Sequence, residues 1–206
     1  MPFGFGRRKP ADDAAVAAAD ARPARPDIPF EAMTEDWRIV ATVTVEGRLG
    51  DVLNRREKLE VSDVAWRPAD GAEPYGPAPG IRTMDPYDLI VVAVTPDSLP
   101  PASEEERAAH KVRKVAFDVA LEVPPYRVTG TIHLYPGTDP EQLLDRHTQM
   151  FIPVTTPTVS HAGTAVDLAE DVDAVLVNRF YLRAVTQIDL RTGRPATDRS
   201  GRPSFA

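Results

Sequence analysis

Six arginines stand at positions where they could bind an anion or a carboxylate. A guanidinium is planar and has several N–H donors, so it pairs well with carboxylate and phosphate oxygens. Two of these arginines follow an aromatic residue, two end a short leucine-containing segment, and two are four positions apart near the C-terminus. The sequence therefore predicts anion or carboxylate binding by a subset of Arg38, Arg55, Arg127, Arg146, Arg179 and Arg183.

The same arginines also have a purely structural explanation. An arginine near a helix C-terminus, as predicted for Arg55 and Arg146, satisfies backbone carbonyls and the helix dipole. Arg179 and Arg183 have the R-x-x-x-R spacing of PilZ domains, which bind a cyclic dinucleotide. The downstream PilZ element is not reproduced, because in Asp198-Arg-Ser-Gly201 the glycine comes one position early. Two outward-facing arginines on one strand are the structural alternative.

Catalytic chemistry has little support in the sequence. The histidines lack the H-x-x-x-H spacing that places two imidazoles on one helix face, and there is no nucleophile elbow or glycine-rich phosphate loop. The chain contains no cysteine, which excludes disulfides and thiol nucleophiles. We predict no catalytic residues, no metal site and no cofactor. A metal-dependent hydrolase using His133 and His147 is the enzyme alternative.

Composition restricts the class of protein further. The 206 residues are 42% hydrophobic with a net charge of −7, and the acidic residues lie mostly between two slightly basic ends. An acidic body is a poor nucleic-acid platform, since phosphate contacts need clustered Lys and Arg. No apolar run approaches the length of a membrane span. We expect a cytoplasmic protein with no nucleic-acid or membrane partner and with disordered tails at 1–29 and 190–206.

The strongest pattern is internal similarity between two halves. Trp37-Arg-Ile-Val-Ala-Thr-Val-Thr-Val-Glu-Gly47 matches Tyr126-Arg-Val-Thr-Gly-Thr-Ile-His-Leu-Tyr135 in its aromatic, arginine and alternating aliphatic positions. Three further blocks follow in the same order in both halves, which is typical of a duplicated unit. They pair Asp51–Arg55 with Glu141–Arg146, Leu59–Asp63 with Ile152–Thr156, and Asp88–Val94 with Asp173–Val177.

Alternating apolar positions predict strands, and each half has the order strand, short helix, strand, strand. The fold class is α+β, predominantly β, with two tandem copies forming antiparallel sheets as a small barrel or sandwich. The copies are predicted to span 30–111 and 112–189. The apolar run of Leu89–Val94 predicts a central strand, and Val112–Val123 predicts a hairpin with the strand from Tyr126. No matching strand is predicted before Trp37.

Local signals add detail to the helices and loops. Asp139 and Gly50 are the predicted N-caps, with Leu53 and Leu144 in the core. The Pro/Gly-rich stretch Arg67–Pro86 predicts a long loop. Ser103-Glu-Glu-Glu106 fits a capping box and predicts a helix over 104–111.

Three blocks resemble an uncharacterised bacterial domain family. They are Gly47-Arg-Leu-Gly-Asp-Val-Leu-Asn54, Phe151-Ile-Pro-Val-Thr155 and Val175-Leu-Val-Asn178. The family pattern is R-L-S-D-x-L-N, then F-L-P-L-T, then V-N-R. This chain departs from it with Gly50 in place of the serine. The family has no known activity, so the resemblance supports the β-rich module alone.

Three functions follow from these observations. The first is a non-enzymatic protein-binding or assembly module, whose partner is another protein or a second copy of the chain. The second is a small-molecule or nucleotide sensor that uses the arginines. The third is the metal-dependent hydrolase.

Overall fold

The computed structural model describes residues 27–45, 47–95, 114–144, 149–169 and 171–196. They form one antiparallel sheet of 13 strands, with one short α-helix. The strand order is β13-β12-β7-β8-β9-β11-β6-β1-β2-β3-β4, with β10 beside β9 and β5 beside β3. The sheet is not closed into a barrel: its ordered path ends at β13 and β4.

The first unit, residues 27–95, is built on a meander of three long strands. Ile39, Ala41 and Val43 of the central strand are buried, so its alternating pattern gives one face to the core. The last strand of the unit returns to lie beside the first. Its elements are β1 (Asp27–Met33), β2 (Trp37–Thr44), α2 (Leu49–Asn54), β3 (Leu59–Pro68), β4 (Gly76–Pro77), β5 (Thr83–Met84), η1 (Pro86–Asp88) and β6 (Val91–Val94).

The second unit, residues 114–196, also begins with a meander. A hairpin through Pro124-Pro125 joins its first two strands, as the alternation predicted. Its later strand Ala184–Asp189 lies beside its first strand. Its elements are β7 (Val115–Val123), β8 (Tyr126–Leu134), η3 (Pro140–Leu144), β9 (Phe151–His161), β10 (Thr164–Ala165), β11 (Ala174–Asn178), η4 (Arg179–Tyr181), β12 (Ala184–Asp189) and β13 (Arg194–Pro195).

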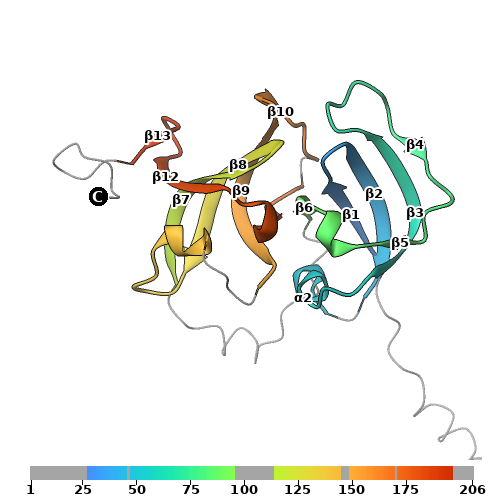
Figure 1. Cartoon of the computed structure of the whole chain (residues 1–206), viewed down its shortest axis with the longest axis horizontal. Coiled ribbons are helices and arrows are strands. Elements are labelled where there is room, and N and C mark those ends of the chain that lie inside the picture. The colour runs from blue at the N-terminus through green and yellow to red at the C-terminus, as the bar shows by residue number, and fades with distance from the viewer. Residues whose placement is uncertain (1–26, 46, 96–113, 145–148, 170, 197–206) are drawn as a thin grey trace, which may run out of the picture.

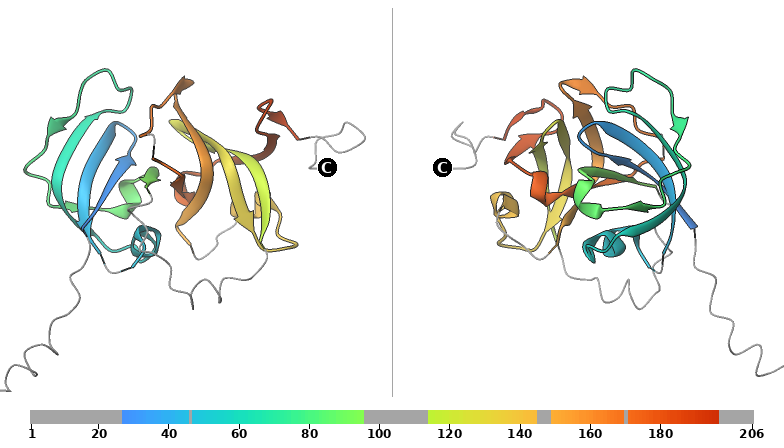
Figure 2. Two further views of the ribbon diagram at one scale, coloured as in Figure 1. Left: turned by 180° about the vertical axis from the view of Figure 1, so that it is seen from behind. Right: turned by 45° about the vertical axis from the view of Figure 1, so that its right-hand side comes forward.

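The two units form separate curved groups of strands that meet where β11 pairs with β6 (Figures 1 and 2). Each unit has its own apolar core, and each core also includes residues of the other unit. Met150, Phe151 and Leu176 join the core of the first unit. Met33, Ala69, Ile90 and Val91 join the core of the second. The units are therefore coupled by backbone hydrogen bonds and by shared apolar packing.

Both meanders contain an irregularity at a similar place. The pairing of β2 with β3 shifts between Val40 and Thr42, and the pairing of β8 with β9 shifts between Thr129 and Thr131. Asp63 and Thr156, beside these shifts, have positive φ values of 51° and 47°. A bulge bends its strand and increases the local twist.

Some expectations about strands need correction. A strand, β1, does precede Trp37, and it begins at Asp27, inside the segment assigned to the N-terminal tail. The composition of 1–29, rich in alanine and proline, suggested a tail, yet seven residue pairs with β2 hold β1 in the sheet. The predicted loop Arg67–Pro86 contains β4 and β5. Within the predicted C-terminal tail, β13 pairs with β12.

The helices also differ from expectation. In the first unit Gly50 lies inside α2 and the N-cap is Arg48. In the second unit the helix is a 3-10 turn, and its tighter winding buries Leu143 and leaves Leu144 46% exposed. Asp139 accepts a hydrogen bond from the Glu141 N–H, as a cap should. The central position of β6 is confirmed, since it lies between β1 and β11. The helix predicted at 104–111 lies outside the described residues.

Candidate functional site

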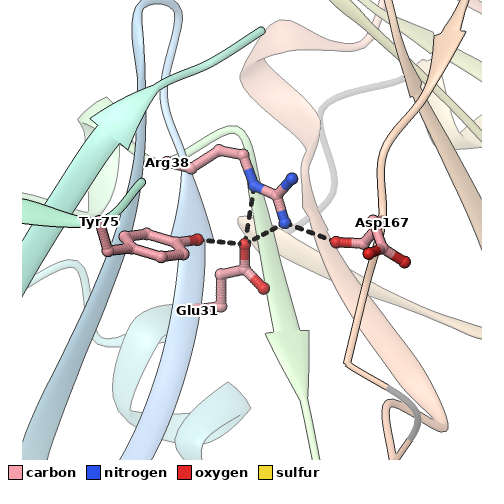
Figure 3. Close-up of polar contacts among 4 residues, drawn as sticks. All are labelled: Glu31, Arg38, Tyr75 and Asp167. Atoms are coloured by element: carbon pink, nitrogen blue, oxygen red, sulfur yellow. Dashed lines mark hydrogen bonds and ion pairs between the residues drawn. The ribbon is translucent and has the colours of Figure 1, made fainter. Parts of the chain in front are cut away.

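A buried ion pair lies where the two units meet (Figure 3). Arg38 on β2 is directly opposite Met33 on β1, so Glu31 is its diagonal neighbour across the strand pair. The side chains of Arg38 and Glu31 are 4% and 14% exposed. Arg38 Nη2 also donates to the carbonyl of Asp167, 2.7 Å away, in the second unit. This arginine therefore stabilises both the first unit and its contact with the second.

One carboxylate oxygen of Glu31 accepts hydrogen bonds from two side chains of the cluster. Oε1 accepts from Arg38 Nε at 2.8 Å and from the Tyr75 hydroxyl at 2.7 Å. Arg67 lies 4.5 Å above the centre of the Tyr75 ring. Burial, followed by the hydrogen bond to Glu31 and its negative charge, raises the pKa of Tyr75 to about 12. The cluster thus favours the neutral form of the Tyr75 hydroxyl.

The free energy of unfolding should fall at high pH because of Tyr75. Its folded pKa is about 12 and its ordinary value is 10.0, so the folded protein holds this proton more tightly. The contribution is complete below pH 10.0 and is lost as the pH rises through about 12. Urea unfolding measured across this range should show a smaller loss in Tyr75→Phe. Tyr135→Phe, at a ring that is 58% exposed, is the matched control and should behave as the wild type. An equal loss in all three proteins would contradict this assignment.

A cavity of about 220 Å³ adjoins the ion pair. Its lining includes Arg38 and Asp70 of the first unit and His161 of the second. His161 packs against Tyr126, whose hydroxyl donates to the carbonyl of Thr34 in the first unit at 2.9 Å. The cavity presents groups of both charge signs. It is therefore a polar seam between the units rather than a site selective for one charge.

Two tryptophans form a stacked pair on the surface of the first unit. The ring centres of Trp37 and Trp66 are 4.7 Å apart with an interplanar angle of 20°, and the residues are 39% and 37% exposed. We call them the tryptophan surface. Two exposed acidic residues lie close to it along the backbone: Asp36 precedes Trp37, and Asp70 follows Ala69, whose N–H donates to the Asp36 carbonyl. Stacked aromatic rings with an acidic border suit recognition of another macromolecule.

The structure separates most of the arginines that the sequence singled out. Arg127 lies on β8, which four strands separate from β2 in the sheet, and forms an exposed ion pair with Glu122 at 3.2 Å. Arg55 is the exposed C-cap of α2, at the end of the helix as predicted. Arg146 lies outside the described residues. Arg38 and Arg127, which match in sequence, thus have very different surroundings.

Arg179 and Arg183 do not form an outward-facing pair on one strand. Arg179 begins the 3-10 turn η4 and is 8% exposed, whereas Arg183 is exposed and donates from Nη1 to the Phe180 carbonyl at 3.2 Å. The side chain of Asn178 caps this turn by accepting from the Phe180 N–H. Because η4 precedes β12, which begins only at Ala184, the two arginines do not share a strand and lie in different environments.

The three blocks that resemble the uncharacterised family meet in one place. The Asn54 side chain accepts from the N–H groups of Met150 and Phe151 at 2.7 and 2.9 Å. Phe151 pairs with Asn178 across β9 and β11, and Asn178 Nδ2 donates to the Leu89 carbonyl at 2.7 Å. Sequence reasoning missed Glu31, Tyr75 and these two asparagines as structural residues. A polar residue at the end of an apolar strand, as at Asn178, was the available signal.

Comparison of the chain with protein-family models, curated proteins and solved structures found no match. Within the described ranges, no group of three or more metal-binding side chains is present. Among the same residues, no helix has the length and apolar character needed to cross a bilayer.

Proposed function

We propose that the two units are divergent copies of one module, fused into a non-enzymatic protein-binding body. The duplication is supported by topology: in each unit the strand that closes the unit lies beside the first strand, and a 3-10 turn precedes it. Asp85 and Asn178 cap these two turns in the same way, each accepting from the N–H two residues later. On this proposal, β1, β2 and β3 correspond to β7, β8 and β9.

Strand register gives independent support. Met33 pairs with Arg38 on β2 and with Val91 on β6, and Glu122 pairs in the same way with Arg127 and Ala184. Leu59 pairs with Met84 on β5, as Ile152 pairs with Val177 on β11. The two strand shifts, with their positive-φ residues, also fall at corresponding positions. Unrelated meanders would not be expected to share all of these registers.

This correspondence replaces the last of the four pairings made from the sequence. The sequence paired Asp88–Val94 with Asp173–Val177, because both are aliphatic runs after an aspartate. Strand register instead matches β6 with β12 and β5 with β11. The family resemblance stays a proposal, and the meeting of its three blocks at the junction of the units supports it.

The proposed function rests on one surface that is buried in the second unit and exposed in the first. Trp37 and Trp66 correspond to Tyr126 and Val159, which are 2% and 0% exposed. The second unit packs this surface against the first unit, and the Tyr126 hydroxyl bonds to a turn there. The first unit has two exposed tryptophans at the same place. We therefore assign the tryptophan surface to a partner that presents a turn with apolar side chains beside it, as Met33 and Ile90 do in the contact between the units.

A different protein is favoured over a second copy of this chain. If copies stacked as the units do, the second unit would have to offer the surface that the first unit offers. Met33 and Ile90, buried in that contact, correspond to Glu122 and to the exposed Arg183. In addition, β13 covers part of the outer edge of β12. Charged side chains and a covered edge both oppose strand-to-strand association. The acidic border favours a turn flanked by Lys or Arg.

Removal of the tryptophan surface should weaken partner binding without unfolding the protein. The whole chain serves as bait to capture proteins from a lysate of the cells that produce it. Each captured candidate is then purified and its affinity for the chain is measured by titration. The double variant Trp37→Ala/Trp66→Ala should bind at least ~10-fold more weakly, since tryptophans that become buried in an interface often supply much of its binding free energy. Tyr87→Ala, at another exposed aromatic residue, is the matched control and should bind as the wild type. A partner that binds the double variant with unchanged affinity would contradict the assignment.

A further inference from the structure

A second cavity, of about 330 Å³, lies within the second unit at the end of the β7–β8 hairpin. This volume falls at the lower end of the range for small-molecule sites. Part of its wall is apolar and comes from Ile132, Leu143 and Ile152. The polar part comes from Lys114, His133, Tyr135, Thr138, Gln149 and Arg179. The cavity therefore combines an apolar wall with a group of hydrogen-bond donors.

The charge of this lining has one sign. Lys114 and Arg179 have basic side chains and His133 has an imidazole, and among the described lining residues there is no Asp or Glu. This is unusual in a chain with a net charge of −7. The cavity beside Arg38 differs, because Asp70 faces it as well. A cationic lining with low-dielectric walls favours an anion.

Two hydrogen bonds hold the backbone around Arg179 in place. Its backbone N–H donates to the Met150 carbonyl at 2.8 Å, and Asn178 before it caps the turn. The residue is 8% exposed and lines the cavity. In the proposed correspondence of the units, Arg179 matches Pro86, so the two units differ at this position. A buried arginine that lines a cavity offers N–H donors suited to an anionic head group.

The lining also includes an aromatic ring. The Lys114 ammonium lies 5.6 Å from the centre of the Tyr135 ring, and the ring is 58% exposed. His133 lies near the end of β8 and Tyr135 follows just after that strand, and both side chains belong to the lining of the cavity. An aromatic ring beside two basic groups can stack on a planar body while the basic groups hold its charge.

We propose that this cavity binds a small organic anion with a phosphate or carboxylate head and a planar or apolar body. The head group lies near Arg179 and His133, and the body lies against Tyr135 and the aliphatic wall. The site is separate from the tryptophan surface and adds a ligand-responsive property to the second unit. No covalent step is involved.

The test is a titration of the whole chain, by calorimetry and by NMR, with anions and matched uncharged compounds. The probes are inorganic phosphate, adenosine monophosphate with adenosine, and indole-3-acetate with indole-3-acetamide. At least one organic anion should bind at least ~10-fold more tightly than its uncharged partner, a difference of about 1.4 kcal/mol. Amide shifts should be confined to residues near His133 and Gln149. Binding of phosphate by itself would identify the head group as the main determinant.

Variants separate this site from general electrostatic attraction. Lys114→Gln and His133→Gln change exposed side chains, so both should fold, and each should weaken binding at least ~3-fold. Arg127→Gln removes an exposed arginine at the far end of the same strand and should leave binding unchanged. Trp37→Ala/Trp66→Ala should also bind the anion normally, even if the proposed partner site fails. Equal binding of charged and uncharged probes, or unchanged binding by Lys114→Gln and His133→Gln, would overturn the proposal.

Discussion

Replacement of Arg38 by methionine should lower the free energy of unfolding by about 3 kcal/mol, the lower end for a broken buried ion pair. The variant keeps much of the apolar stem but removes the guanidinium. Glu31, 14% exposed, then loses the charge that compensates its carboxylate. The Asp167 carbonyl also loses its donor from the first unit. Urea unfolding followed by circular dichroism measures the change.

The corresponding arginine of the second unit provides the control. Arg127 and Glu122 form an ion pair with side chains 50% and 41% exposed, so water already solvates both charges. Arg127→Met should therefore cost about 0.5 kcal/mol or less. The double variant Glu31→Gln/Arg38→Met should recover part of the stability lost in Arg38→Met, because the uncompensated charge is gone. Similar losses in Arg38→Met and Arg127→Met would show that burial of the first pair has no energetic consequence.

Replacement of Phe151 by alanine should destabilise both units together by about 3–5 kcal/mol. Phe151 belongs to β9 of the second unit but packs in the core of the first, where it is 1% exposed. The chain has two tryptophans, and both lie in the first unit. Tryptophan fluorescence therefore reports on the first unit alone. The fluorescence and circular dichroism transitions should shift together to lower urea concentration.

Phe180 is the matched control for this prediction. It is 47% exposed and stacks on Tyr87 with ring centres 5.6 Å apart. Its replacement by alanine should cost about 1 kcal/mol, the value expected for an exposed aromatic pair. If Phe151→Ala shifted the circular dichroism transition but left the fluorescence transition unchanged, the units would be independent. The shared packing would then not couple them.

Local pattern was sufficient to predict the β-rich class and several individual elements. Alternating aliphatic residues in β2, β7 and β8 identified strands, because every second side chain must face the core. The continuous apolar run of β6 identified a strand covered on both sides. Asp139 identified a helical start, since its carboxylate can accept from nearby backbone N–H groups. Each of these features depends on residues close together in the chain.

The candidate sites could be predicted only in part. Arg38 and Arg179 were singled out by residue type and spacing, and both are buried. Nothing in the sequence separated Arg38 from its match Arg127, because the difference is the neighbour that covers Arg38. Likewise, Glu31 and Tyr75 converge on one oxygen from positions far apart in the chain. Burial of a charge depends on the distant segment packed over it.

The sequence by itself determined where the alternating strands such as β2, β7 and β8 form and which of their faces are apolar, since both follow from the period of side-chain alternation. It also showed that two halves share a pattern. Tertiary structure decided that β1 is a strand, that β11 joins β6, and that Phe151 completes the core of the other unit. These features need hydrogen bonds and apolar contacts between distant segments. Their free energy comes from long-range pairing, which local propensity does not encode.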